Sequence, residues 1–150
     1  MPTPLKSSLV LLLATFGLAV ADAQPDSRRL VELPPMMQEH MLGNMRDHLR
    51  ALEEVLSKLA KGEIDEAGWL AEKRIGMSSL EMHGASHMAP YMPEGMRAIG
   101  TEMHRATSRF AKAAQEAELE NSQESRRKLF SALQAILTQC NACHSAYRIR

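Results

Sequence analysis

The chain has 150 residues and no formal net charge at pH 7, with 18 Lys and Arg against 18 Asp and Glu. A length of this order fits one domain, and a neutral chain gives no reason to expect nucleic acid or an anionic membrane as a partner. Aromatic residues make up only 4% of the chain and 11 residues are methionine. The strong helix formers Leu, Ala, Met, Glu, Lys and Arg dominate, which predicts an all-α protein.

The first 23 residues have the pattern of a secretory signal peptide. Lys6 precedes an apolar run over residues 9–20, and Ala21-Asp22-Ala23 matches the small-residue site at which such signals are cleaved. The run is too short for a comfortable membrane span, since a transmembrane helix needs about 20 apolar residues. We therefore expect residues 1–23 to be removed on export. A mature domain of residues 24–150, without a membrane span, would remain.

Two helices are predicted in the first half of the mature domain. After a polar lead-in over residues 24–32, Pro34-Pro35 opens a helix that ends at Lys61-Gly62. A second helix, with Asp65 as its N-cap, is expected to run with a weaker apolar pattern to about Leu80. Apolar residues of the first helix recur at steps of three and four, as on one helix face: Leu42, Met45, Leu49, Leu52, Leu56 and Leu59.

Two more helices follow a loop that we expect over residues 81–92. The third begins at Pro93, and its apolar face is predicted to carry Met96, Ile99, Met103, Ala106, Phe110, Ala113 and Ala117. Residues 119–125 break it and offer caps for the fourth helix. The face of the fourth is predicted to carry Leu129, Leu133, Ile136, Cys140, Cys143 and Tyr147. Four amphipathic helices with short connections predict an antiparallel up-down-up-down four-helix bundle.

The two cysteines of the chain lie three residues apart in the sequence CNACH, at Cys140–His144. A disulfide would fit this helical spacing poorly, and so short a loop gives little stabilisation. A zinc site needs about four ligands, and a thioredoxin-like pair expects a βαβ setting. C-x-x-C-H is instead the signature of covalent c-type haem attachment. In that chemistry the two thiols add to haem vinyl groups as thioethers, and the following histidine ligates the iron.

A four-helix bundle with C-x-x-C-H near its C-terminus, followed by x-x-Tyr-Arg, resembles the class II c-type cytochromes, cytochrome c′ and its low-spin relatives. The matching motif is CNACHSAYR, at Cys140–Arg148, and helix order and length agree over the mature chain. The resemblance implies a periplasmic protein with one haem c and its iron, which is not an enzyme and exchanges electrons with redox partner proteins. The haem contacts that it implies are thioethers from Cys140 and Cys143, proximal ligation by His144, and packing around the haem by Tyr147 and Arg148.

The distal side of the iron decides the function. In an up-down-up-down bundle the end of the fourth helix lies beside the start of the first, so the level of His144 falls near positions 40–46. Met45 lies there on the predicted apolar face, and the resemblance implies Met45 as distal ligand, with Met41 and His48 as alternatives. His/Met ligation would make a low-spin electron carrier. An open sixth position would instead make a five-coordinate protein that binds nitric oxide or carbon monoxide.

Methionine and histidine are concentrated in the segment EMHGASHMAPYMPEGM, residues 81–96. Imidazole and thioether ligands suit copper, which makes His83 and His87 candidate ligands. We expect instead that the methionines fill gaps at the haem end, that both histidines face water, and that copper does not bind there. The resembled family often dimerises through its first two helices. A homodimer stays open here, because the outer face of the first helix is heavily charged: Arg46, Asp47, Arg50, Glu53, Glu54 and Lys58.

Overall fold

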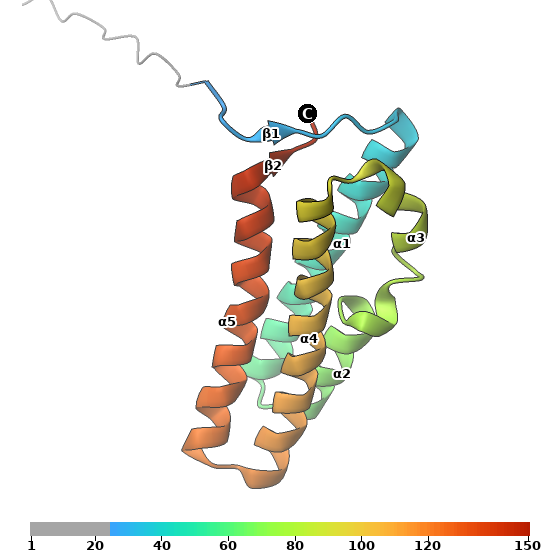
Figure 1. The fold of residues 1–150 in the computed structure, drawn as a ribbon. Helices are drawn as coiled ribbons and strands as arrows, with labels where there is room; N and C mark the ends of the chain where they lie inside the picture. Colours follow the sequence, from blue (N-terminus) through green and yellow to red (C-terminus); the bar gives the residue numbers. More distant parts are fainter. Residues whose placement is uncertain (1–24) are drawn as a thin grey trace, which may run out of the picture.

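The structure is a computed structural model that describes residues 25–150, and the predicted signal peptide, residues 1–23, lies outside the described residues. The described chain is all-α apart from two strands of two residues each (Figure 1). Its α-helices are α1 Pro35–Ala60, α2 Ile64–Arg74, α3 Ala85–Met88, α4 Glu94–Glu120 and α5 Gln123–Ala146. The remaining elements are β1 Arg29–Leu30, η1 Met77–Ser79, η2 Ala89–Tyr91 and β2 Tyr147–Arg148, where η marks a 3₁₀ helix.

Four helices, α1, α2, α4 and α5, form what we call the helical body. They lie side by side in Figure 1, and each runs in the opposite direction to the one before it. The helix α4 packs against both α5 and α2, and α2 packs against α1. The helices α1 and α5, in contrast, approach each other closely at very few points. None of the helices in the described part is both long and apolar enough to cross a membrane.

The helix ends follow the predicted signals, with two corrections in α2. Ser122 caps α5, because its hydroxyl accepts from the Ser125 N–H while the Ser125 hydroxyl accepts from the Ser122 N–H. Asp65 is not an N-cap but lies inside α2, which Glu63 precedes. The helix α2 also ends at Arg74 rather than near Leu80. The chain turns there, which buries the Ile75 side chain in the core.

The helical body is held by a first core of small, branched and aromatic side chains drawn from all four helices. Its fully buried members include Ala51 and Val55 of α1, Ala67 and Ala71 of α2, Phe110 and Ala114 of α4, and Leu129 and Ile136 of α5. The predicted apolar face of α4 is confirmed, since Met96, Met103, Ala106, Phe110 and Ala117 are all buried. The first part of the α5 face is confirmed as well, by buried Leu129, Leu133 and Ile136.

The predicted apolar face of α1 is confirmed only in part, because the most buried residues lie about one position earlier along the helix. Leu49 and Leu56 are 70% and 53% exposed, respectively. The buried residues of α1 are instead Met41, His48, Ala51 and Val55. The small side chains Ala51 and Val55 lie in the core, and Leu52 and Leu59 pack against it while half-buried.

A second, methionine-rich core lies at the other end of the helical body, and we call it the methionine core. Its buried members are Val31, Met41, Met88 and Met96, and Met37, Met45, Met92, Cys143 and Tyr147 are among the half-buried residues packed on it. The strands β1 and β2 close this end as a parallel pair, with Arg29 opposite Tyr147. The Val31 N–H extends the pair by donating to the Arg148 carbonyl at 2.8 Å. The lead-in predicted to be merely polar is therefore tied to the C-terminus.

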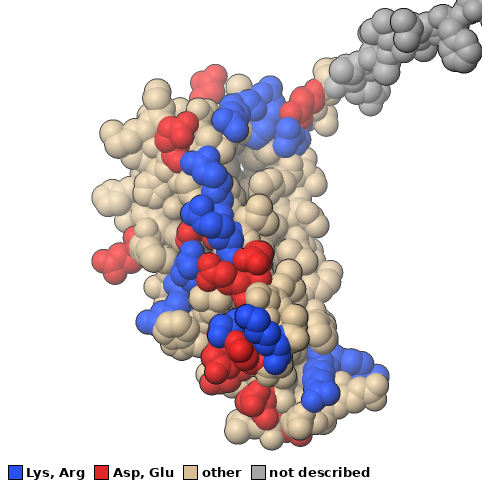
Figure 2. Space-filling view, turned by 180° about the vertical axis from the view of Figure 1, so that it is seen from behind, with Lys and Arg blue, Asp and Glu red and all other residues tan. Residues whose placement is uncertain are grey.

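Charged side chains of both signs are interspersed on the face of the molecule seen in Figure 2. On the outer side of α1, Asp47 pairs with Arg74 of α2 at 2.7 Å and with Arg50 at 3.3 Å. Arg74 also lies 3.7 Å from Glu54. Exposed pairs of this kind stabilise a fold by about 1 kcal/mol or less each, so they add to the α1–α2 packing without dominating it.

Candidate functional site

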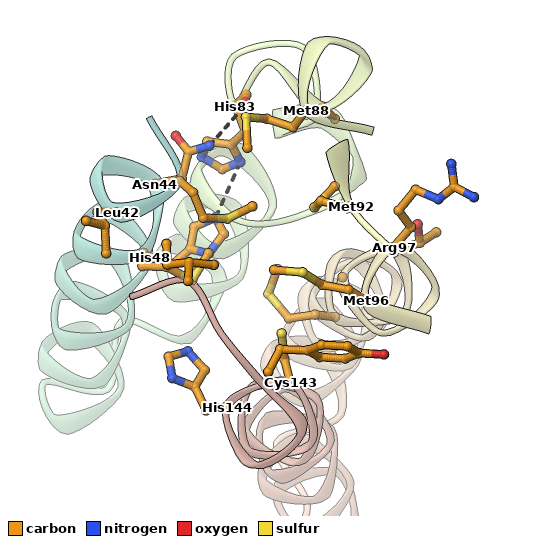
Figure 3. Close-up of a pocket in the computed structure, with 18 of the residues that line it drawn as sticks. Leu42, Asn44, His48, His83, Met88, Met92, Met96, Arg97, Cys143 and His144 are labelled. Carbon is orange, nitrogen blue, oxygen red and sulfur yellow. Dashed lines mark hydrogen bonds between the residues drawn. The ribbon is translucent and has the colours of Figure 1, made fainter. Parts of the chain in front are cut away.

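A cavity of about 600 Å³ opens at the methionine-core end of the helical body (Figure 3). Its wall comes from α1, α4, the end of α5, and the segment between α2 and α4. Six methionine side chains are part of this wall: Met41, Met45, Met88, Met92, Met96 and Met103. The cavity lies where α1 and α5 do not pack closely, so a bound group there would fill space that the helices leave between them.

Most of the predicted haem-site residues line this cavity. Cys143 and His144 reach it from the last turn of α5, and Tyr147 and Arg148 reach it from β2. In Figure 3, Cys143 faces Met96, and His144 projects from α5 on the side of α1. Cys140 is not part of the wall and packs, half-buried, against the first core.

The thiols and the histidine of the CNACH motif differ in their surroundings. Cys140 and Cys143 are free thiols, and burial raises the pKa of both, because the thiolate loses its hydration. The His144 side chain is exposed. Its backbone carbonyl accepts from the Arg28 guanidinium at 3.4 Å, which links the end of α5 to the segment before β1. The motif therefore presents an accessible imidazole beside two partly shielded sulfurs.

The predicted distal candidates lie on the α1 side of the same cavity. Met41 is buried in the methionine core, and Met45, one turn later, is half-buried. Both line the cavity, as does His48, which is buried one further turn along the helix. The structure thus brings Met41, Met45 and His48 to one cavity with His144 but does not choose among them.

Four arginines, Arg28, Arg97, Arg148 and Arg150, also line the cavity. The Arg148 Nε is buried without a hydrogen-bond partner among the described residues, and the Asp26 carboxylate lies 3.6 Å from it, beyond hydrogen-bond distance. A buried guanidinium N–H without a partner favours an anionic group nearby. The carboxylates of a haem propionate have this chemistry, so the cavity fits a haem in both its apolar lining and its cationic residues.

Three histidines from three segments meet at one part of the cavity wall: His48 of α1, His83 of the segment between η1 and α3, and His104 of α4. Their exposed fractions are 8%, 6% and 8%. Each offers a ring nitrogen within 4.8 Å of those of the other two. The prediction that His83 faces water is therefore wrong. His87 is exposed, as expected, and is not part of this cluster.

The loop that carries His83 is fixed to α1 through its backbone. The His83 carbonyl accepts a hydrogen bond from the Asn44 side-chain amide at 2.9 Å and lies 3.0 Å from His40 Nε2. Gly84 follows with φ +62°, and a Cβ there would lie 3.0 Å from the His40 ring. Glycine permits both the left-handed backbone and the close approach. The His83 ring is consequently held against His48, with His83 Nδ1 at 3.4 Å from His48 Nε2 (Figure 3).

Burial lowers the pKa of all three clustered histidines. Loss of hydration is the largest cause in each case, and it brings the pKa of His48 to about 3. The positive charges that the other histidines would carry act in the same direction on His48 and His83. At neutral pH the cluster therefore consists of neutral imidazoles, which have lone pairs available.

From the sequence, His48 is an alternative distal iron ligand and His83 a copper candidate together with His87, whereas His104 is not predicted as a site residue. The residues are separated by 35 and 21 positions, so no local spacing marks them as a group. The available signal is weak: His48 and His104 are polar residues at inward positions of amphipathic helices. No protein-family model, curated protein or solved structure matches this chain. The resemblance to class II cytochromes therefore stays a prediction.

Proposed function

We propose that this chain is a mono-haem c-type cytochrome of the class II kind, an antiparallel four-helix bundle that acts in the periplasm as a one-electron carrier. The observation that carries the proposal is the cavity of about 600 Å³ that Cys143 and His144 share with six methionines. A cavity of this size lies within the range of cofactor sites, about 300–1,000 Å³. When bound there, haem c supplies an iron that cycles between the ferrous and ferric states.

The residues of the C-terminal motif would hold the haem. Cys140 and Cys143 would form the two thioethers, and His144 would be the proximal ligand. Cys140 packs against the first core, so the attachment would be anchored in the rigid part of the protein. His144 is exposed and adjacent to Cys143, and its imidazole is free to turn toward an iron.

The methionines of the cavity wall would exclude water and supply the distal ligand. We assign this role to Met45, with Met41 as the alternative one turn earlier. Thioether side chains are flexible and pack into irregular gaps, so the other methionines of the wall, among them Met88 and Met96, would close around the haem. Met ligation saturates the iron and raises its reduction potential. Such a protein transfers electrons and performs no chemistry on a substrate.

The cavity arginines would hold the haem propionates. Arg148 is the strongest candidate, because its buried Nε has no hydrogen-bond partner among the residues that the structure describes. Arg28 is partly engaged already, since its guanidinium donates to Asp26 at 2.7 Å. Arg97 is exposed on α4 at the cavity wall and would be available to a second propionate.

The spectrum of the purified protein tests this proposal. The full precursor is produced in a host that matures c-type cytochromes, and the oxidised protein is examined for the weak long-wavelength band of Met–Fe(III) ligation. We expect that band in the wild type and in Met36→Leu, a control whose side chain is 76% exposed. Met45→Leu should abolish it and give a high-spin spectrum.

Each other result has a defined meaning. If Met41→Leu loses the band and Met45→Leu retains it, the distal iron ligand is Met41 rather than Met45. A high-spin spectrum in the wild type would contradict the electron-carrier proposal. It would favour the alternative function, a five-coordinate protein that binds nitric oxide or carbon monoxide. Double replacement of Cys140 and Cys143 by serine should yield protein without covalent haem. Covalent haem in that variant would refute the attachment itself.

A further inference from the structure

We infer that His48, His83 and His104 form a second metal site, which binds one divalent transition-metal ion of the zinc and copper type through three imidazoles. The three side chains come from α1, the segment between η1 and α3, and α4, and all are buried. A ring nitrogen of each lies within 4.8 Å of those of the other two. This inference does not depend on the proposed haem function, since none of its ligands belongs to the C-x-x-C-H motif.

The donor set indicates the kind of metal. Neutral imidazole suits zinc, copper, iron and nickel, whereas magnesium and calcium require oxygen ligands. Among the described residues, neither a carboxylate nor a thiolate belongs to the cluster. Three protein ligands with an open fourth position are a known arrangement for zinc. The fourth position here would face the cavity, because all three histidines line it.

The spacing is close to what such an ion needs. Zn–N bonds of about 2.0–2.1 Å in a tetrahedral site place the ligand nitrogens about 3.3–3.4 Å apart. The His48 and His83 rings are already in contact, with His48 Nε2 at 3.4 Å from His83 Nδ1. Since none of the three ligand nitrogens is more than 4.8 Å from another, side-chain movements of about 1 Å would close the cluster on an ion.

Two of the rings are oriented in the way that metal-binding histidines usually are, with the nitrogen away from the metal donating to a protein acceptor. His104 Nδ1 donates to the Ile75 carbonyl, which leaves the His104 Nε2 lone pair free. Ser79 Oγ lies 3.2 Å from His83 Nδ1 and donates its own proton to the Gly76 carbonyl at 2.7 Å. Ser79 can therefore accept the Nδ1 proton of His83, and the lone pair of His83 is then on Nε2.

One nitrogen of the cluster lacks a partner. His83 Nε2 is buried and makes no hydrogen bond to any described residue. Leaving a buried polar atom unpaired costs about 1–3 kcal/mol of stability. The backbone carbonyl of His83, in contrast, is hydrogen-bonded to Asn44, so the unpaired ring nitrogen needs an explanation. A metal ion ligated by Nε2 would remove this cost. Burial lowers the pKa of each of the three histidines, which is compatible with this geometry, because neutral imidazoles need not release a proton to bind.

The charged groups around the cluster are balanced. The Asp47 carboxylate acts on His48 and His83, and the Glu72 carboxylate acts on His104, both in the direction that favours positive charge. Arg74 and His40 act on His83 in the opposite direction. Two carboxylates from α1 and α2 thus lie near enough to offset part of the charge of a bound dication, although neither is a ligand.

Zinc titration of the processed, haem-containing protein tests the inference. After treatment with a chelator and dialysis, one equivalent of Zn²⁺ should bind per protein, as measured by calorimetry and by elemental analysis. X-ray absorption at the zinc edge, which haem iron does not obscure, should report three imidazole ligands. Cu²⁺ is the second probe, and its electron paramagnetic resonance spectrum should show nitrogen coordination.

Single replacements identify the ligands. His48→Gln, His83→Gln and His104→Gln should each lower the Zn²⁺ affinity by more than about 100-fold, because loss of a ligand exceeds the 10–100-fold effect of its supporting groups. The matched control is His87→Gln, four residues from His83 and exposed, which should bind like the wild type. Circular dichroism shows whether each variant is folded. The wild-type stoichiometry and absorption spectrum test the site even where a variant does not fold.

Two outcomes would overturn the inference. One is a wild-type protein that retains less than about a tenth of an equivalent of zinc or copper after dialysis from a micromolar solution of the ion. The other is a haem spectrum that loses a second histidine ligand in His48→Gln, because that imidazole would then belong to the iron. Loss of metal binding with an unchanged haem spectrum supports the site. Failure of this site leaves the proposed haem function unaffected, since the optical test of Met45 is separate.

Discussion

The two ends of the helical body are built from different side chains. The first core uses alanine, branched residues and Phe110, and its central members are fully buried between four helices. The methionine core uses flexible thioethers, draws on loops and the two short strands, and surrounds a cavity of about 600 Å³. Packed alanines bring helices together without a ligand. Methionines around a cavity adapt to whatever fills it.

This difference indicates a division of labour. The first core would keep the helices in place whether or not a cofactor is bound, because close packing within it needs nothing further. At the other end, Arg148 Nε and His83 Nε2 are buried and have no hydrogen-bond partner within residues 25–150. Buried polar atoms without a hydrogen-bond partner are rare in native proteins. The end of the helical body that carries the CNACH motif is thus the end at which a bound ligand would satisfy unpaired polar atoms.

The largest effect is expected from truncation in the first core. Phe110 is 0% exposed, and Phe110→Ala should lower the free energy of unfolding by about 3–5 kcal/mol through lost burial and an unfilled cavity. Met96→Ala, at the edge of the existing cavity, should cost about 2 kcal/mol, because flexible neighbours can adapt. Urea unfolding of the haem-free protein measures both. Equal losses would remove the distinction between the two cores.

A glycine pair gives a smaller and sharper test. A Cβ on Gly68 of α2 would lie 2.7 Å from Ala114 Cβ, whereas a Cβ on Gly43 of α1 would meet no atom within 4 Å. Gly68→Ala should therefore destabilise the protein by about 1–2 kcal/mol, since the helix backbones must separate. Gly43→Ala should stabilise it by about 0.5–1 kcal/mol, because alanine is the better helix former. The two changes in urea midpoint should have opposite signs. A gain in Gly68→Ala would show that α2 and α4 are not in close contact.

Sequence periodicity predicted the helices well and the site only in part. The face of α4 was readable because its inward residues, Met96 to Ala117, are apolar at regular steps. The face of α1 was not, because its leucines formed a more conspicuous stripe than the buried His48, Ala51 and Val55. Which of two adjacent stripes is buried depends on the partner helix. That information is absent from the periodicity of α1.

The same reason limits prediction of the site. CNACH matches the signature of haem attachment within five consecutive residues, and helix order is enough to place Met41 and Met45 near it. The histidine cluster needs three segments to converge, and it depends on the early end of α2 at Arg74, which was not predicted. Once the chain turns there, the Ile75 carbonyl can accept from His104, and Ser79 can reach His83. These are tertiary contacts, and the spacing of residues along the chain does not predict them.

The smallest predicted effect concerns the ion pairs that flank each core. Hydrogen bonds from Arg28 lower the pKa of Asp26 to about 2, and Arg148 adds to this effect. A carboxyl with a lowered pKa stabilises the fold above its usual pKa of 3.8, and this contribution is lost as the pH falls through about 2. Asp26→Asn should therefore lower the melting temperature slightly at pH 6, and the difference from the wild type should vanish near pH 2.

Hydrogen exchange assigns this small effect to one end of the molecule. Asp26 contacts Arg28 and Arg148 beside the β1–β2 pair, so Asp26→Asn should speed exchange of the Val31 amide, which donates to Arg148. The matched control is Glu63→Gln, which breaks the 2.6 Å pair with Lys58 between α1 and α2. It should leave the Val31 amide unchanged. Equal acceleration in both variants would mean that the strands over the methionine core open only when the whole helical body unfolds, and the two ends would then be one cooperative unit.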